Sequence, residues 1–371
     1  MIYLTILLSI IAIQILPNRK YYINIKSQQF IISKKSISEF VLVIELMFIT
    51  CFRKYTVGTD LRMYTRLFGE INEYSWKDIL NSKFEPGYMI YTRFINFFSD
   101  NIQVFIAVTG FLTVGIYIYE IFRKSYDAFL VMYLSLTFGF FFFQFTALRQ
   151  VIAMALFMFA IDRLEKRKWI DYIIIILIAS TFHLSVLVCI PFALIVILPW
   201  TNRLLKLIWM IEIVAVVMMR GILELVVFYF PRYSYILKET TNYRLGYIAR
   251  IIIICGLYLI SVFYCKIGRQ GFKLYVKADN DSKETFILIL GSIATVLMTM
   301  INYFESVQRM TYYFIPYVFL CVDIAINKNR KMQKVIPAIY IFLGMYYILC
   351  FTGYTSINTP FGVRDYLFFW Q

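Results

Sequence analysis

The segment IQVFIAVTGFLTVGIYIYEI, residues 102–121, decides the fold class of this chain. It contains one charged side chain, Glu120, in twenty residues. A helix crosses the hydrocarbon of a bilayer with roughly 20 apolar residues, so this segment has the length and polarity of a transmembrane helix. Comparable apolar runs occupy residues 1–16, 38–52, 127–145, 150–161, 170–182, 184–199, 204–219, 247–265, 285–302, 309–326 and 335–352.

The composition of the whole chain agrees with this segment. Of the 371 residues, 61% are hydrophobic and only 16% are charged, which is more apolar surface than a soluble domain of this size can hide. Two nearly continuous apolar stretches, residues 127–161 and 170–199, are too long for one helix each. We expect breaks near Ala147–Gln150 and near His183. The sequence therefore predicts an all-α, polytopic membrane protein with about ten to twelve transmembrane helices in a single domain, residues 1–371.

Basic residues are distributed unevenly among the connections between the runs. The formal net charge is +15, and lysine and arginine gather in every second connection. The positive-inside rule assigns those connections to the cytoplasm, which explains most of the excess charge without any nucleic acid. Both termini then lie outside. The outer face also receives two loops, 53–101 and 231–246, together with Arg149, His183 and Arg309.

The first outer loop begins with KYTVGTDLRMYTRLF, residues 54–68. Asp60, Tyr64 and Phe68 are four residues apart and share one face of an expected amphipathic helix. Either Thr59 or Asp60 is suited to the N-terminal cap of that helix. One interpretation is an interfacial helix that lies at the membrane surface. The other is a face that meets a sugar, and for Asp60 we favour the second.

The same loop ends with KFEPGYMIYTRFINFFS, in which Glu85–Tyr88 predicts a turn followed by a helix. Aromatic rings such as Tyr88 stack on sugars, although tyrosine also favours the membrane interface for its own sake. Glu85 is an isolated acid beside a turn at membrane level. It is a candidate general base or a ligand for a hydroxyl group.

Arg149 begins an otherwise apolar helix in the segment TALRQVIAMALF. A charge near hydrocarbon is unfavourable, and one interpretation is that the side chain extends outward to water. The alternative is an anion clamp, because a guanidinium group binds phosphate in a bidentate manner. Gln150 follows directly and can add a hydrogen bond.

His183 is the only histidine, and it lies between two apolar runs. A lone histidine is often a satisfied polar group, yet an ionisable residue at membrane depth also indicates a functional site. We consider a role as general acid or base, or as a hydrogen-bond donor to phosphate. No Cys/His cluster accompanies it, so neither a metal nor another cofactor is expected.

Two further arginines come from later outer segments. Arg309 begins an apolar run in the same way as Arg149, although a helical ion pair with Glu305 is the simpler interpretation. Arg244 lies in the loop 231–246. Several arginines at helix ends on one face would suit a diphosphate.

Five short motifs follow one another along the chain: VGTDxxxY (Val57–Tyr64), EPGY (Glu85–Tyr88), LRQ (Leu148–Gln150), FHxS (Phe182–Ser185) and RxxYY (Arg309–Tyr313). Each motif is short, and their order is the specific feature. The order resembles that of the EpsG-type, Wzy-like polymerases of bacterial exopolysaccharide and capsule. The resemblance covers residues 40–325, which is most of the chain.

The resemblance implies a fold that is GT-C-like in broad character and a metal-independent glycosyltransferase of the bacterial cytoplasmic membrane, with its active site facing outside. It implies that a growing glycan moves from undecaprenyl diphosphate to another lipid-linked repeat unit. The implied partners are these lipid-linked oligosaccharides and the bilayer, with flippase and chain-length regulator proteins as further candidates.

That chemistry assigns expected roles to the residues above. Fixed cations stabilise a departing diphosphate without reorganisation, and the candidates are Arg149, Arg309 and Arg244. A base accepts the proton of the attacking hydroxyl, and the candidates are Asp60, Glu85 and His183, with a slight preference for the first. The candidate sugar-binding residues are Tyr64, Tyr88 and Gln150.

Two other functions share parts of this pattern. A lipid-linked glycan ligase would use the same donor and the same arginines. A transporter or flippase of lipid-linked oligosaccharides would have paired internal repeats and helices interrupted near the midplane. The sequence contains no such repeat, and its unexplained charges fall on one face, which favours an enzyme.

Overall fold

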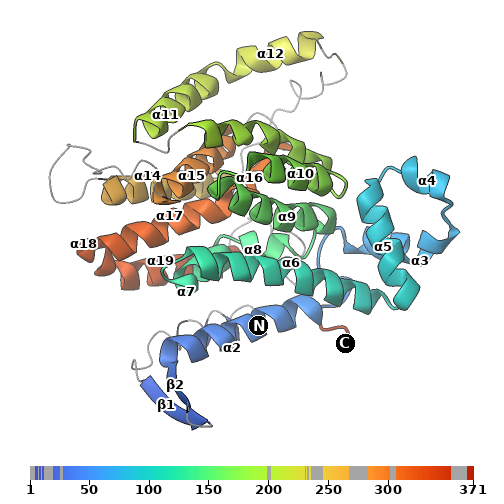
Figure 1. The fold of residues 1–371 in the computed structure, drawn as a ribbon, viewed down its shortest axis with the longest axis horizontal. Helices are drawn as coiled ribbons and strands as arrows, with labels where there is room; N and C mark the ends of the chain where they lie inside the picture. The colour runs from blue at the N-terminus through green and yellow to red at the C-terminus, as the bar shows by residue number, and fades with distance from the viewer. Residues whose placement is uncertain are drawn as a thin grey trace. The chain divides into compact units, whose positions relative to one another are not determined.

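The structure is a computed structural model of the chain. The described residues are 5–6, 8–9, 11, 20–25, 28–198, 202–229, 231, 234, 245–266, 283–300, 306–351 and 366–371. Most of the first apolar run and most of the loop 231–246, including Arg244, lie outside this set. The ribbon in Figure 1 shows the arrangement of the elements within each part of the chain.

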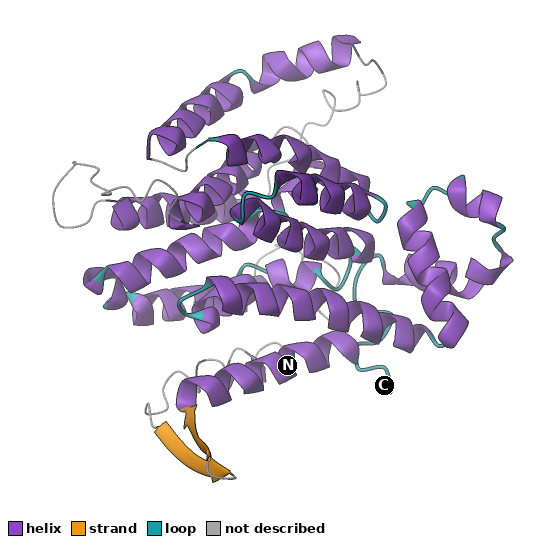
Figure 2. Cartoon of the chain, viewed as in Figure 1, coloured by secondary structure: helices purple, strands orange, loops and turns teal. Residues whose placement is uncertain are grey.

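Helices account for nearly all of the described secondary structure (Figure 2). Within the described residues, the exceptions are one antiparallel hairpin, β1 (Lys20–Ile25) with β2 (Gln28–Ser33), and an isolated bridge between Arg53 and Phe368. In the hairpin, Lys20 lies opposite Ser33 and Ile25 opposite Gln28. The prediction of an all-α fold is confirmed.

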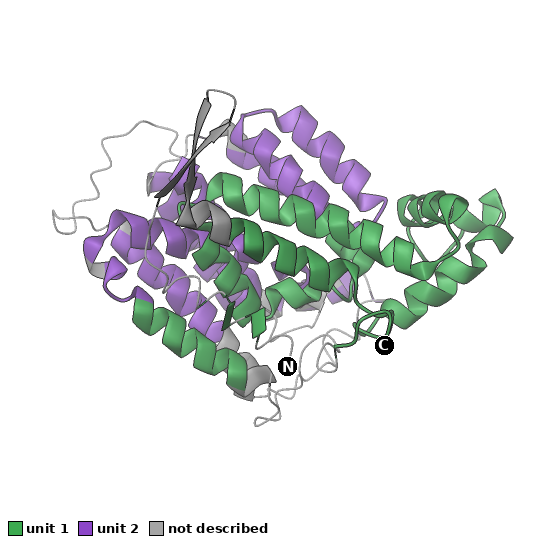
Figure 3. Ribbon diagram, turned by 90° about the horizontal axis from the view of Figure 1, so that it is seen from below, with its two compact units in different colours: residues 1–152, 337–371 green, residues 153–336 purple. Residues whose placement is uncertain are grey.

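The chain divides into two compact units (Figure 3). Unit 1 comprises Met1–Ile152 and Pro337–Gln371, and unit 2 comprises Ala153–Ile336. The helices of unit 1 are α2 (Lys34–Cys51), α3 (Leu61–Glu70), η1 (Ile71–Glu73), α4 (Trp76–Leu80), α5 (Pro86–Phe98), α6 (Ile102–Lys124), α7 (Ala128–Thr137), α8 (Phe140–Phe143) and α19 (Ile336–Phe351). The helices of unit 2 are most of α9 (Leu148–Glu165), α10 (Trp169–Ser180), η2 (Leu184–Ile197), α11 (Asn202–Val217), α12 (Met219–Tyr229), α14 (Leu245–Lys266), α15 (Lys283–Met300), α16 (Ser306–Thr311), α17 (Ile315–Lys328) and α18 (Arg330–Gln333). The beginning of α9, up to Ile152, belongs to unit 1, so Arg149 lies in the same unit as the loop 53–101.

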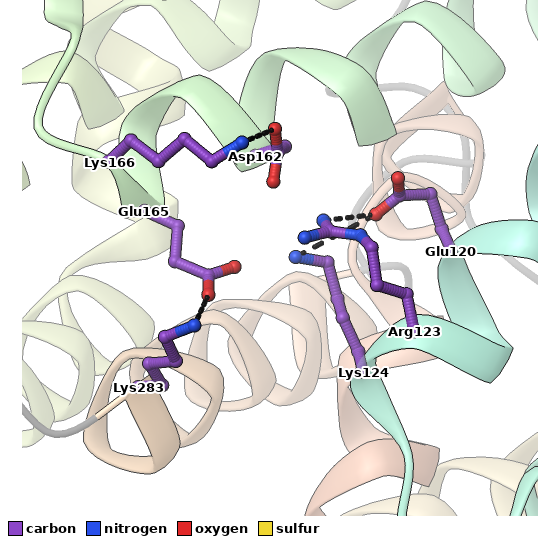
Figure 4. Close-up of polar contacts among 7 residues, drawn as sticks. All are labelled: Glu120, Arg123, Lys124, Asp162, Glu165, Lys166 and Lys283. Atoms are coloured by element: carbon purple, nitrogen blue, oxygen red, sulfur yellow. Dashed lines mark hydrogen bonds and ion pairs between the residues drawn. The ribbon is translucent and has the colours of Figure 1, made fainter.

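Helix α6 is the opening segment of the sequence, and it runs the full predicted length. Asn101 caps it by accepting a hydrogen bond from the backbone of Gln103 at 2.9 Å. Arg123 and Lys124 lie in its last turn, where they complement the helix dipole. Glu120 binds both of these cations, at 2.8 and 3.7 Å, as Figure 4 shows. These caps account for both ends of the helix.

Helix α2 packs along α6 at close range. A Cβ atom on Gly110 would lie only 2.7 Å from Cγ2 of Thr50, so a small residue is needed where the two helices approach. Of the described helices, α6 alone is long and apolar enough to cross a membrane by length and composition. Several shorter apolar helices accompany it, and the number of transmembrane segments stays a prediction.

Proline and turn chemistry divide the predicted apolar runs further than the sequence suggested. The break near Ala147–Gln150 is present, and the run 127–145 breaks once more at residues 138–139, between α7 and α8. The break near His183 is also present. The run 184–199 forms a 3-10 helix, η2, with Pro191 inside it. Proline has no backbone N–H to donate, and this agrees with the absence of a regular α-helix there.

The prediction that Arg309 begins one long helix is wrong. Arg309 belongs to the short helix α16, and α17 starts only at Ile315. Pro316 occupies the first turn of α17, a position that suits proline because its missing N–H needs no partner there. Helix α17 is buried from Ile315 to Ile326 among helices of unit 2.

Ion pairs tie the polar ends of the unit 2 helices together. Lys283 at the start of α15 binds Glu165 at the end of α9, with 3.2 Å between Nζ and Oε1 (Figure 4). Asp162 in the last turn of α9 binds Lys166, which directly follows the helix, at 2.9 Å. In each pair the lysine is exposed, which limits the free energy that the pair contributes, and the pairs mark where the apolar segments end.

The C-terminal residues 366–371 pack against the end of α2. The Tyr366 hydroxyl donates to the carbonyl of Ile49 at 2.7 Å, and the backbone of Phe369 donates to the carbonyl of Phe52 at 3.0 Å. Phe368 lies 5.5 Å from the ring of Phe48. The tail therefore supports the point at which α2 leads into the loop 53–101.

We expect Phe368→Ala to lower the stability of unit 1 by about 1–2 kcal/mol, since the ring is only partly buried and the same substitution at a fully buried site costs about 3–5 kcal/mol. Phe97→Ala is the matched control, because its side chain is 81% exposed. Thermal unfolding of both variants in the same detergent tests this expectation. Equal melting temperatures for the two variants would contradict it.

Candidate functional site

The start of the loop 53–101 lies against the turn that precedes α9. Arg53 is buried, and its guanidinium group lies 4.8 Å from the centre of the Phe145 ring. The hydroxyl groups of Thr59 and Thr146 are hydrogen bonded to each other, and the backbone of Asp60 donates to the Thr146 hydroxyl at 3.2 Å. These contacts hold the VGTD motif beside the LRQ motif.

Gly58 makes this contact possible. Its φ angle is +119°, and a Cβ atom there would lie 2.3 Å from the carbonyl oxygen of Phe145. Any other residue would place a side chain here, which would strain the backbone and clash with the Phe145 carbonyl. The glycine of the VGTD motif is therefore explained by a close approach of two backbone segments.

Asp60 occupies the N-cap position of α3, as the sequence indicated, but its side chain makes no capping hydrogen bond. The carboxylate is half-exposed and close enough to Tyr64 to affect its ionisation. Further along the same face, Phe68 is buried and lies 5.1 Å from the ring of Phe105. The far end of the predicted sugar-facing surface thus packs inside unit 1.

Glu85 is the N-cap residue of α5, and Pro86 is the first residue of that helix. The expected turn at Glu85–Tyr88 is therefore the first turn of a helix. The Glu85 carboxylate binds Arg149, with 2.5 Å between Oε2 and Nη1. Arg149 is the second residue of α9, close to where the sequence placed it.

Arg149 is held on several sides rather than extended freely toward water. Its guanidinium group lies 5.0 Å from the centre of the Phe84 ring and close to the Tyr64 side chain. Its side chain is 19% exposed, and that of Glu85 is 10% exposed. A cation held over an aromatic face and beside a carboxylate has little freedom to move. We call Tyr64, Phe84, Glu85, Tyr88 and Arg149 the Arg149 cluster.

Two tyrosines form the buried side of this cluster. The rings of Tyr64 and Tyr88 are 5.4 Å apart, and these residues are 3% and 0% exposed. Burial raises the pKa of both phenols, and the positive charge of Arg149 partly opposes the rise. Both hydroxyl groups are therefore neutral near pH 7. Within the described residues, the hydroxyl of Tyr88 and Nε of Arg149 are buried without a hydrogen-bond partner.

Sequence reasoning missed two contributors to this site. Phe84 directly precedes the EPGY motif, and Thr146 lies two positions before the start of the LRQ motif. An aromatic residue beside a candidate acid was the available signal for Phe84. No local signal marks Thr146, since its role depends on a hydrogen bond to Thr59 across 87 residues of sequence.

The family comparison agrees with the motifs. A model of the EpsG family matches residues 37–366. This chain belongs to the EpsG family. The EpsG family consists of Wzy-like polysaccharide polymerases, so this EpsG chain is a membrane protein with a polymerase role of the Wzy type. No curated protein and no solved structure matches it.

The remaining predicted site residues of this EpsG protein are not part of the Arg149 cluster. Gln150 is buried next to Arg149 at the start of α9. In unit 2, His183 is the N-cap residue of η2 and is half-exposed. Ser185 and Tyr313 pair through their hydroxyl groups at 3.1 Å.

Arg309 is exposed on α16, whereas its predicted partner Glu305 lies outside the described residues. In the part of the chain that the structure describes, no three His, Cys, Asp or Glu side chains are grouped as metal ligands would be. The convergence of the outer arginines on one face stays a prediction.

We expect Gly58→Ala to destabilise this EpsG protein by at least about 2 kcal/mol, because a left-handed conformation is unfavourable for alanine and the new methyl group meets the Phe145 carbonyl. Gly69→Ala in α3 is the control. A Cβ atom there meets nothing within 4 Å, and alanine is more favourable than glycine inside a helix by up to about 1 kcal/mol.

Thermal unfolding of the two variants in detergent measures the difference. A melting temperature that falls for Gly58→Ala and stays level or rises for Gly69→Ala is the expected result. Equal effects of the two substitutions would show that the loop does not depend on the close contact with Phe145.

Proposed function

We propose that this protein transfers a growing glycan from undecaprenyl diphosphate to a second lipid-linked oligosaccharide repeat unit at the outer face of the bacterial cytoplasmic membrane. The observation that carries this proposal is Arg149, a cation fixed at a helix start by Glu85, Phe84 and Tyr64. A group held in this way stabilises developing negative charge without reorganisation, which is the demand that a departing diphosphate makes.

In the proposed step, a hydroxyl oxygen of the acceptor sugar attacks the anomeric carbon of the donor. The bond between that carbon and the diphosphate oxygen breaks, and its electron pair leaves with the diphosphate. The hydroxyl proton passes to a general base. The net result is one new glycosidic bond and one free lipid diphosphate, with no oxidant or second substrate required.

Asp60 is our preferred base. It lies at the start of α3, it is half-exposed, and its carboxylate is not used to cap the helix. Glu85 and His183 remain the alternatives. Glu85 is bound to Arg149, so it would first have to leave that cation.

The roles of the other candidates follow the same chemistry. We propose Arg309 and Arg244 as further cations for the diphosphate. Tyr64, Tyr88 and Gln150 are proposed to contact the sugar. All three are buried in this conformation, which implies that sugar contact at these residues requires the cluster to open. Flippase and chain-length regulator proteins are the proposed protein partners.

The test is polymerisation by the purified protein in liposomes that contain a defined repeat unit on undecaprenyl diphosphate, with product length read on a gel. Arg149→Ala should reduce chain elongation by roughly 100-fold or more, as loss of one oxyanion-stabilising group does in other enzymes. Arg66→Ala is the matched control, since Arg66 is exposed and pairs with the surface residue Glu70 one helical turn away.

Full elongation by Arg149→Ala would contradict the proposal. The location of unpolymerised units in cells separates the alternatives. Single lipid-linked units that accumulate on the outer leaflet support a polymerase, whereas units retained on the inner leaflet indicate a flippase. Elongation should also persist in the presence of a chelator, and an absolute need for a divalent metal would contradict the metal-independent step.

A further inference from the structure

The positive charge of Arg149 is already compensated in this structure. The Glu85 carboxylate lies 2.5 Å from Nη1, and both side chains are largely buried. An anion that approaches Arg149 must therefore share the guanidinium group with Glu85 or replace it. The strength of charge-assisted hydrogen bonds makes this competition significant.

The same cluster contains hydrogen-bonding capacity that is not used. Nε of Arg149 and the hydroxyl of Tyr88 are buried and have no partner within the described residues. Tyr88 is 0% exposed, and its ring lies 5.4 Å from that of Tyr64. Buried donors without acceptors are rare in native proteins and require an explanation. An incoming group with several acceptor oxygens provides one.

We propose that Glu85 occupies the position of the donor diphosphate on Arg149 and that the two anions exchange. This inference rests on the proposed function. A diphosphate ester carries more negative charge than one carboxylate and has enough oxygens to reach Nη1 and Nε of Arg149 together with the Tyr88 hydroxyl. The exchange makes and breaks hydrogen bonds only.

The exchange has consequences for the order of events. With the donor bound, the Glu85 carboxylate no longer has its cation and becomes available close to the reacting group. After transfer, Glu85 can rebind Arg149 and displace the lipid diphosphate. A residue in this role weakens the binding of every anion at Arg149, and it speeds the release of the lipid diphosphate.

The strength of the competition between Glu85 and diphosphate for Arg149 can be measured as a change in the affinity for diphosphate. If Glu85 holds Arg149 in roughly nine of ten molecules, the apparent affinity for diphosphate is reduced about tenfold. Glu85→Gln keeps the shape and removes the charge. It should therefore bind inorganic diphosphate about tenfold more tightly than the wild type.

Calorimetric titration of the full-length protein in detergent with inorganic diphosphate, at one fixed ionic strength, is the experiment. Arg149→Ala should abolish binding, both alone and combined with Glu85→Gln. Glu70→Gln is the matched control, because Glu70 also binds an arginine at 2.8 Å but on the exposed surface of α3. Its affinity for diphosphate should equal that of the wild type.

Equal or weaker binding by a folded Glu85→Gln protein would overturn the proposal, since Glu85 would then position Arg149 rather than compete for it. If that variant does not fold, Glu85→Asp takes its place. The shorter side chain reaches Arg149 less well, so its affinity should lie above that of the wild type, and an unchanged or lower affinity would overturn the proposal.

Tyr88→Phe tests the unused donor separately. It should weaken diphosphate binding several-fold without lowering the melting temperature, because it removes a buried hydroxyl that has no partner in the free protein. Unchanged or tighter binding would exclude the Tyr88 hydroxyl from the anion site.

A second titration, with a short-chain prenyl diphosphate, separates a lipid-linked ligand from free diphosphate. Tighter binding of the prenyl form indicates a lipid-linked donor, and equal binding indicates that the diphosphate alone is recognised. Failure of the two proposals is also distinguishable. If Glu85→Gln binds diphosphate more tightly but the wild-type protein forms no polymer, the proposed function alone is contradicted. If the wild-type protein forms polymer but Glu85→Gln does not bind diphosphate more tightly, the exchange alone is contradicted.

Discussion

Arg149 carries a positive charge at the start of a helix that is apolar from Val151 to Ile161, and a charge in that position needs compensation. Glu85 supplies the opposite charge, Phe84 an aromatic face and Tyr64 a hydroxyl group. Removal of either charge would leave the other largely buried and unpaired, which is much less favourable than the complete pair. This requirement connects the beginning of α5 with the beginning of α9.

The contact between the VGTD segment and the turn before α9 supports that pair. Gly58 allows the two backbones to approach, and Thr59 and Thr146 join them by a hydrogen bond. Helix α3 starts directly afterward, so this contact also determines where Tyr64 lies. A polar contact among few residues thereby positions one wall of the Arg149 cluster.

Chemistry and stability make opposing demands on this cluster. A buried ion pair is weak evidence for stability, because desolvation of both charges offsets most of their attraction. In the function proposed above, the value of the pair lies in its geometry, since a fixed guanidinium group would be ready for an anion. The buried Tyr88 hydroxyl and Nε of Arg149 add to the unfavourable terms in the free protein. In the proposed exchange, a bound diphosphate would relieve both.

The sequence by itself determined the helical class, the positions of most apolar segments and the candidate residues Asp60, Glu85 and Arg149, because hydropathy and helix signals are local properties of the chain. The tertiary structure decided that Glu85 meets Arg149 across 64 residues, that Phe68 packs inward and that Arg309 belongs to a short separate helix. These outcomes depend on which segments approach each other in space. A single sequence records the charges and the turns, but it does not record which of them pair.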